Sequence, residues 1–198
     1  RSPSDTEWPE RYWFARTTMT ENIHDKDALS KQGSPAGADI LLVGQPNVGK
    51  SVLFSRLTGV RTIASNYPGT TVGYTAGSMR FAGRSFTVVD APGAYSLEPL
   101  DEAARVAIDL IDGAKRIINV VDATHLERHL PLTLELLAQG KPMVVALNMS
   151  DEARHLGIEI DVEALERRLG VPVVPTVART GENVAQLIQV AFSLDALG

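Results

Sequence analysis

Residues Gly44–Ser51 carry the side chains and spacing best suited to chemistry, because they follow the pattern G-x-x-x-x-G-K-S. The glycines let backbone N–H groups approach a phosphate closely, and Lys50 can place its charge beside the β- and γ-phosphates of a nucleotide. The Ser51 hydroxyl is a suitable Mg²⁺ ligand. The apolar run Ile40–Val43 before this loop and the helical pattern after it give the strand–loop–helix context of a phosphate site. A glycine-rich turn with an exposed lysine is the alternative interpretation.

Asp90 is a second candidate, because it directly follows the apolar residues Val88 and Val89 and begins the sequence Asp-Ala-Pro-Gly. At the end of a buried strand, its carboxylate can hold Mg²⁺ through a water molecule, and Gly93 can present its N–H to a γ-phosphate. Taken alone the pattern is weak, since an aspartate that only caps a turn has the same sequence. Its place at a strand end after the phosphate loop favours the metal-binding interpretation.

Asn148 and Asp151 form a third group, spaced N-x-x-D directly after the apolar run Met143–Leu147. An aspartate can accept hydrogen bonds from the N1–H and the amino group of guanine, whereas adenine offers no such pair of donors. Asn148 would steady the base and the loop. The alternative is a helix cap, with Ser150 or Asp151 at the start of a following turn. Together with the other two loops, the pair favours a guanine site.

The elements that would position these residues alternate along the chain. Strands are predicted at Ile40–Val43, Ser85–Val89, Lys115–Val121, Met143–Leu147 and Val173–Val174, and helices at 51–58, 101–112, 126–139, 161–169 and 182–192. A hairpin through Gly83-Arg84 adds one antiparallel strand, Gly77–Ala82. The pattern predicts an α/β fold, with a mostly parallel six-stranded sheet and helices on both faces. The loops after Val43, Val89 and Leu147 should then converge at the carboxyl edge of the sheet.

Composition narrows the class of protein. The chain has 198 residues, 44% hydrophobic and 22% charged, which suits one globular domain over residues 39–198. The net charge of −5 argues against a nucleic-acid partner, and no apolar run approaches the ~18 residues needed to span a membrane. The lack of cysteine excludes disulfides and cysteine metal sites. Residues 1–38 are interpreted as an N-terminal extension or linker, whose aromatic residues form either a docking element or a tail that packs locally.

Several longer stretches resemble a known protein family. The phosphate loop, a threonine-bearing loop, the Asp90 motif and the Asn148 motif follow the order found in small GTPases. The closer resemblance is to the cytosolic G domain of FeoB, the ferrous iron transporter B, over about residues 39–192. It is carried by Gln45-Pro46-Asn47, Asn66–Val72, Asp90–Leu97, Asn119–Ala123 and Ala146–Met149. The fold that this resemblance implies is the P-loop GTPase fold.

The resemblance also implies roles for individual residues. The implied nucleotide-binding residues are Gly44, Gln45, Pro46, Asn47, Val48, Gly49, Lys50, Ser51, Val52, Thr70, Thr71, Asp90, Gly93, Asn148, Met149, Asp151, Val177, Ala178 and Arg179. The implied catalytic residues are Asn47, Lys50, Thr71 and Gly93. The implied Mg²⁺ ligands are Ser51, Thr71 and, through water, Asp90. The fifth motif, at Val177–Arg179, departs from the usual Ser-Ala pattern.

Two positions imply an unusual mode of hydrolysis. Ala94 stands where many GTPases carry a water-orienting glutamine, and its methyl group can neither orient nor polarise a water. The resemblance implies that Asn47 helps to hold a K⁺ ion, with the backbone carbonyls of Ser65 and Tyr67, in place of an arginine finger. The alternative role for Asn47 is to form the turn. Hydrolysis is therefore expected to be slow unless K⁺ or another group assists.

The implied function is a Mg²⁺-dependent GTPase domain that powers or gates Fe²⁺ uptake from the cytoplasmic face of the bacterial inner membrane. The implied partners are a covalently linked transmembrane Fe²⁺ permease domain, small accessory Feo proteins and further copies of the chain, with no nucleic acid. One rival interpretation is a soluble GTPase of ribosome or tRNA maturation. Another is a nucleotide-binding regulatory module with negligible turnover.

Two further groups of residues are expected to be surface features. His125 and His129 have the i, i+4 spacing that can bind a metal, but no third ligand is evident, so an exposed helix face is expected. A solvated helical face is likewise the expected position of Glu159, Asp161, Glu163 and Glu166.

Overall fold

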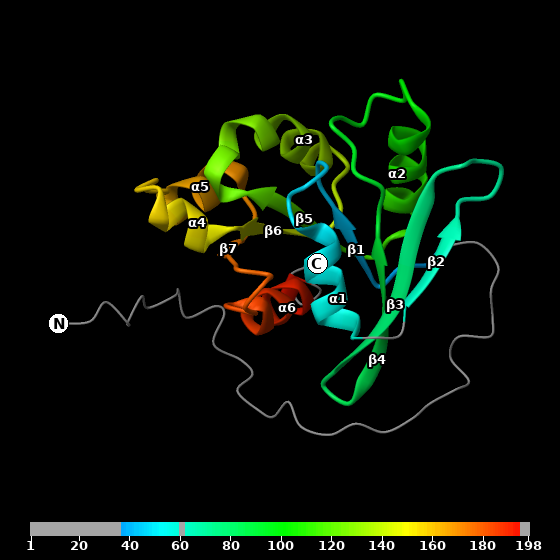
Figure 1. Ribbon diagram of the computed structural model, residues 1–198, viewed down its shortest axis with the longest axis horizontal. Coiled ribbons are helices and arrows are strands. Elements are labelled where there is room, and N and C mark those ends of the chain that lie inside the picture. Colours follow the sequence, from blue (N-terminus) through cyan, green and yellow to red (C-terminus); the bar gives the residue numbers. More distant parts are fainter. Residues whose placement is uncertain (1–36, 60–61, 195–198) are drawn as a thin grey trace.

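The computed structural model describes residues 37–59 and 62–194 of the chain (Figure 1). The extension predicted for residues 1–38 lies outside this description except for its last two residues. Of these, Ala38 is already buried in the core. The elements are β1 (Ile40–Val43), α1 (Lys50–Thr58), β2 (Thr62–Asn66), β3 (Gly73–Phe81), β4 (Arg84–Asp90), α2 (Glu102–Gly113), β5 (Ile117–Asp122), the short 3₁₀ helix η2 (Ala123–His125), α3 (Leu126–Ala138), β6 (Met143–Asn148), α4 (Ser150–His155), α5 (Val162–Leu169), β7 (Val173–Pro175) and α6 (Val184–Ser193).

The strands form a seven-stranded sheet in the order β2-β3-β4-β1-β5-β6-β7. Strand β3 runs antiparallel to β2 and β4, and the other neighbouring strands pair in parallel, so the predicted mostly parallel sheet with one antiparallel strand is confirmed. The predicted number of six strands is wrong, because β2 was missed. This edge strand is short, and its sequence Thr-Ile-Ala-Ser-Asn has no apolar run. Its pairing with β3 also moves the start of β3 from the predicted Gly77 to Gly73.

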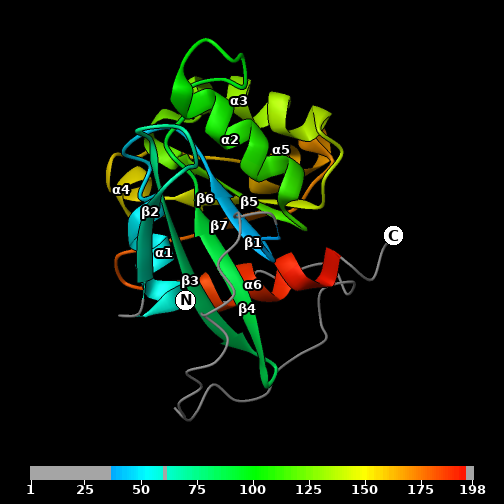
Figure 2. The same ribbon diagram turned by 90° about the vertical axis from the view of Figure 1, so that its right-hand side faces the viewer.

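Helices cover both faces of the sheet, as predicted (Figure 2). Along β1, Leu41 and Val43 face the layer that contains α2 and α3, whereas Ile40 and Leu42 face the layer that contains α1 and α6. The alternation follows from the two-residue period of a strand. All of these side chains are fully buried, and each such burial stabilises the fold by about 1.5–3 kcal/mol. The two apolar layers hold β1 rigidly beneath the loop that leaves its carboxyl end.

The strand register brings the polar motifs to one edge of the sheet. Leu42 lies opposite Asp90 in β4, and Asp122 at the end of β5 lies opposite Asn148 at the end of β6. The predicted convergence of the loops after β1, β4 and β6 is therefore confirmed. Among the residues that the structure describes, no helix is long and apolar enough to cross a membrane.

Candidate functional site

The loop between β1 and α1 needs its glycines. A Cβ at Gly44 would lie 2.3 Å from the carbonyl oxygen of Val120, and one at Gly49 would lie 2.3 Å from Nδ2 of Asn148. Gly49 also has a φ of 87°, which side-chain-bearing residues rarely adopt. Close approach of neighbouring backbone therefore shapes this loop, which leads directly into the amino end of α1.

Lys50, Ser51 and Asp90 meet beside this loop. The Ser51 hydroxyl donates to Asp90 Oδ2 over 2.8 Å, and Lys50 Nζ donates to the backbone carbonyl of Gln45 over 3.3 Å. Burial lowers the pKa of Lys50, although the charge of Asp90 opposes this shift. Burial raises the pKa of Asp90, although the Ser51 hydrogen bond and Lys50 oppose it. Lys50 and Asp90 thus lie together in a partly desolvated corner of the site, where burial disfavours the charged form of each.

This corner fits a Mg²⁺ ion. The hydroxyl of Ser51 and the carboxylate of Asp90 are hard oxygen ligands of the kind that Mg²⁺ prefers. Within the described part of the chain, Asp90 Oδ1 is buried and has no hydrogen-bond partner, which leaves one carboxylate oxygen for a metal-bound water. Two of the three predicted Mg²⁺ ligands are therefore in contact.

The other residues of the phosphate loop differ in where their side chains lie. The Gln45 side chain turns away toward α3, where Nε2 donates to the carbonyl of Arg128 over 2.9 Å. Asn47 is exposed with a φ of 66°, and Val52 is half exposed. Pro46 packs against the Asp90–Gly93 motif, because a Cβ at Gly93 would lie 3.0 Å from its backbone N. Gln45 can thus offer a nucleotide only its backbone, whereas the Asn47 side chain faces solvent.

Asn148 joins the phosphate loop to the fifth motif. Its Nδ2 donates to the carbonyl of Val48 over 2.8 Å, and its Oδ1 accepts from the N–H of Ala178 over 2.9 Å. The side chain is only 3% exposed, so both bonds are shielded from water. Asn148 therefore steadies the loops, as predicted.

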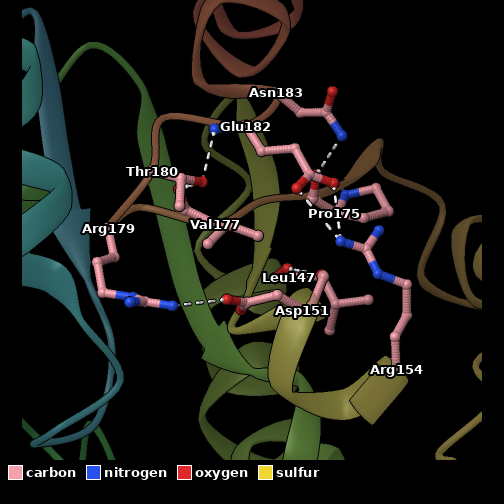
Figure 3. Close-up of polar contacts among 10 residues, drawn as sticks. Leu147, Asp151, Arg154, Pro175, Val177, Arg179, Thr180, Glu182 and Asn183 are labelled. Atoms are coloured by element: carbon pink, nitrogen blue, oxygen red, sulfur yellow. Dashed lines mark hydrogen bonds and ion pairs between the residues drawn. The ribbon is translucent and has the colours of Figure 1, made fainter.

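Asp151 lies on α4 opposite the loop that follows β7 (Figure 3). Met149 precedes this helix in the left-handed conformation, with a φ of 60°. Asp151 Oδ2 lies 3.3 Å from Nη2 of Arg179, an ion pair that joins the predicted base-reading carboxylate to the predicted fifth motif. Val177 closes a turn at the base of that loop, because its carbonyl accepts from the N–H of Gly181 over 2.8 Å.

The threonine-bearing loop stands apart from this group. Thr70 stabilises its own turn by donating from Oγ1 to the carbonyl of Tyr67 over 3.0 Å. Thr71 is exposed, and its hydroxyl donates to Oε2 of Glu102 at the start of α2 over 3.2 Å. Ser65 belongs to β2, opposite Tyr74. The structure thus places Thr71, the third predicted Mg²⁺ ligand, and the Tyr67 carbonyl in contacts of their own, and Ser65 within a paired strand.

The segment after Gly93 is held by the phosphate loop and by α3. Ala94 is buried, and its N–H donates to the carbonyl of Gly44 over 3.4 Å. Further along, the N–H of Leu97 donates to Oε2 of Glu135 on α3. The methyl group of Ala94 therefore points into packed surroundings and offers no group for catalysis.

Sequence reasoning missed two supporting contacts. Arg56 of α1 donates from Nε to the carbonyl of Ala178 over 2.7 Å. Asn119, within β5 and opposite Val43 of β1, donates to the carbonyl of Val43 over 3.3 Å and accepts from the Thr133 hydroxyl over 2.7 Å. Asn119 lies in a stretch that carries the family resemblance, but its contacts, like those of Arg56, join separate segments and leave no local signal in the sequence.

The expected surface features are correct only in part. His125 is exposed beside Asp122, but His129 is buried at 6% exposure, so the expectation of an exposed face is wrong for it. It faces inward because α3 turns this position toward the sheet, and burial lowers its pKa. Asp161 caps α5, and Glu166 accepts from the N–H of Val173. Among the described residues, no group of three or more His, Cys, Asp or Glu side chains could hold a metal ion.

Comparison with known proteins identifies the family. The family profile described as Ferrous iron transport protein B matches residues 38–191. The Fe(2+) transporter FeoB of Salmonella typhimurium is 45% identical over 152 residues, which cover 74% of this chain and 20% of that protein. The chain thus spans about a fifth of the length of this curated relative.

Solved structures agree with this match. A mutant of S. thermophilus NFeoB bound to GDP is 40% identical, with a TM-score of 0.74 over 79% of this chain and 62% of that chain. The FeoB G-domain of Methanococcus jannaschii is 40% identical, with a TM-score of 0.69 over 80% of this chain and 98% of that chain. The chain therefore belongs to the FeoB family, ferrous iron transport protein B, and is its N-terminal G domain.

Proposed function

We propose that this domain binds GTP and hydrolyses it to GDP and phosphate. The observation that carries the proposal is the position of Asn148, which bonds the phosphate loop at Val48 and the fifth motif at Ala178. One side chain thereby joins the phosphate loop to the loop that lies opposite Asp151. The GDP found in the S. thermophilus relative supports a guanine nucleotide as the ligand.

The chain's own residues suit an in-line displacement. Water attacks the γ-phosphorus, the bond from that phosphorus to the β,γ-bridging oxygen breaks, and the proton of the water passes to the released phosphate or to solvent. Lys50 supplies charge to the β- and γ-phosphates, and the N–H of Gly93 is the proposed donor to the γ-phosphate. Asp151 is the proposed reader of the guanine N1–H and amino group.

Ser51 and Asp90 are the proposed residues that hold Mg²⁺, which when bound neutralises charge on the β- and γ-phosphate oxygens. Thr71 is the proposed third ligand. Its hydroxyl donates to Glu102, which leaves the lone pairs of the Thr71 oxygen available to a metal. Thr70 keeps the turn that positions Thr71, by accepting from the N–H of Val72 over 3.2 Å.

K⁺ is the proposed substitute for an arginine finger, and it would assist a site in which Ala94, buried and apolar, cannot orient a water. The exposed amide of Asn47 and the carbonyls of Ser65 and Tyr67 are oxygen ligands of a suitable kind, and the ion would compensate charge on the phosphates. The Tyr67 carbonyl already accepts from Thr70, so it has to exchange that bond to take part. The burial of Ala94 equally favours a second candidate, a regulatory module that binds nucleotide with negligible turnover.

In the whole protein, we propose that this domain powers or gates Fe²⁺ uptake at the cytoplasmic face of the bacterial inner membrane. The permease would be the part of the protein that this chain does not cover, since the chain matches a fifth of the length of its Salmonella relative. Accessory Feo proteins and further copies of the chain remain proposed partners. Membership of the FeoB family removes the support for a GTPase of ribosome or tRNA maturation.

The experiment that tests the proposal measures binding and turnover together. Fluorescent GDP and ADP analogues are titrated into the domain with Mg²⁺, and phosphate release from GTP is followed in parallel. Ser51→Ala should weaken Mg²⁺-dependent GDP binding about tenfold or more, the loss expected for one strong interaction. Ser55→Ala, one turn further along α1, is the matched control and should bind as the wild type does. Equal affinity for GDP and ADP would contradict the proposal, and binding without turnover would favour the regulatory module.

A further inference from the structure

Arg56 connects the helix that follows the phosphate loop to the loop that would carry the guanine base. It lies on α1, one and a half turns after Ser51. Its Nε donates to the carbonyl of Ala178 over 2.7 Å, and its Nη2 donates to the carbonyl of the next residue, Arg179. The planar guanidinium is suited to this task, because it can offer two parallel donors to neighbouring carbonyls.

The same loop is held from its other side. The N–H of Ala178 donates to Asn148 Oδ1, and the side chain of Arg179 pairs with Asp151. Gly181 completes the contact, because a Cβ there would lie 2.9 Å from Nη1 of Arg56. Its φ of 91° also restricts the position to glycine. The loop backbone thus lies directly against the guanidinium, and Asn148 and Arg56 hold the two successive peptide groups that flank the Cα of Ala178.

We propose that Arg56 is a positioning residue that sets how long a guanine nucleotide stays bound. The inference rests on the proposed guanine site, and it adds a residue outside the sequence motifs of that site. Arg56 touches neither phosphate nor base; it acts by fixing the backbone of Ala178 and Arg179. Without it, the carbonyls of Ala178 and Arg179 lose the donor that the structure gives them, so the loop opens more often and the base leaves faster.

The test compares GDP dissociation among variants of the domain. Fluorescent GDP is bound with Mg²⁺ and chased with unlabelled GDP, and the dissociation rate is recorded. Arg56→Ala should release GDP about tenfold faster, since a hydrogen-bonded contact of this kind corresponds to about one decade in an equilibrium constant. Arg56→Lys keeps the charge and one donor direction, so its GDP dissociation rate should fall between those of the wild type and Arg56→Ala. Arg167→Ala removes an exposed arginine of α5 that forms an ion pair with Glu163 at 3.6 Å, and it should match the wild type.

A second measurement separates positioning from general damage. Magnesium pyrophosphate lacks the base, so its affinity for the domain should be unchanged in Arg56→Ala. The single-turnover rate of prebound GTP should also be unchanged. Wild-type GDP dissociation in Arg56→Ala would overturn the inference, and so would an equal loss of pyrophosphate binding. If Arg56→Ala does not fold, Arg56→Lys decides by the same readouts. A wild-type domain that retains no GDP would instead contradict the proposed function itself.

Discussion

The buried charge of Asp90 lowers the stability of the nucleotide-free domain, and this cost can be measured. Its carboxylate is buried at 8% exposure, and one oxygen has no hydrogen-bond partner among the described residues. Burial raises its pKa above the ordinary value of 3.8. Between 3.8 and that raised pKa the folded state binds more protons than the unfolded chain, so the free energy of unfolding falls as pH rises through this window.

Asp90→Asn should therefore stabilise the nucleotide-free domain at neutral pH while it removes Mg²⁺-dependent GDP binding. The amide can still accept from the Ser51 hydroxyl but carries no charge to desolvate. We expect the melting temperature to rise by about 2–4 °C, which corresponds to about 1 kcal/mol in a domain of this size. Thermal unfolding at several pH values measures this change. Asp112→Asn, an exposed carboxyl, is the control, and a lower melting temperature in Asp90→Asn would contradict the account.

Asp151→Asn should shift nucleotide preference from GTP toward xanthosine triphosphate. The amide offers a donor where guanine also offers one, whereas xanthine offers an oxygen. The lost ion pair with Arg179 is largely exposed, so stability should change by less than about 1 kcal/mol. Competition of both triphosphates against fluorescent GDP measures the preference. Unchanged GTP affinity would show that Asp151 does not read the base.

At the scale of single residues, the sequence predicts the positions of the side chains that belong to a sequence motif. Lys50, Ser51, Asp90 and Asn148 stand where their spacing and strand ends predict. The contact between Thr71 and Glu102 was not predictable, because it depends on how the loop after β2 packs on α2. Arg56 was missed for the same reason, since its partners lie at the far end of the chain.

At the scale of elements, β1 and β5 share a buried polar contact with α3. Asn119 on β5 bonds the carbonyl of Val43 at the end of β1, and the Thr133 hydroxyl of α3 donates to its Oδ1. Thr133 and Asn119 are at most 1% exposed, so no water can replace a lost partner easily. Helix α3 thus holds the carboxyl end of β1, where the phosphate loop begins, through Asn119.

Thr133→Val should lower the free energy of unfolding by about 1–3 kcal/mol, because it leaves the Asn119 carbonyl buried with no donor. The methyl group replaces the hydroxyl at nearly constant volume, so packing alone should cost little. Denaturant unfolding measures the change. Thr62→Val, on the exposed edge strand β2, is the control and should stay within about 0.5 kcal/mol. A loss in Thr133→Val no larger than in this control would contradict the assigned role.

Most elements were predictable because their apolar pattern is strong, as a continuous run in β5 and β6 and as a helical period in α2. The failures occur where tertiary pairing decides the structure. Strand β2 exists through its pairing with β3. Helix α4 was not among the predicted helices, and a cap at Ser150 or Asp151 was only the alternative interpretation, since its six residues are too few to show a period.

At the scale of the whole molecule, the chain matches only 20% of the length of its Salmonella relative. If nucleotide binding powers or gates uptake, Lys50→Met in the full-length protein should abolish Fe²⁺ uptake without changing its abundance in the membrane. Uptake of labelled iron by cells measures this effect. Lys141→Met changes a lysine that bonds the carbonyls of Asp112 and Ala114, far from the site in sequence, and should retain uptake. Full uptake by Lys50→Met would separate transport from the nucleotide site.

GTP turnover in KCl compared with NaCl tests the central claim most directly, because it measures hydrolysis and its proposed K⁺ dependence together. With Ala94 buried and apolar, wild-type turnover should be about tenfold or more faster in KCl, and Asn47→Ala should reduce the KCl rate to the NaCl rate. GDP affinity should be similar in both salts, which shows that binding is intact. Equal, slow turnover of the wild type in both salts would contradict a K⁺-assisted GTPase.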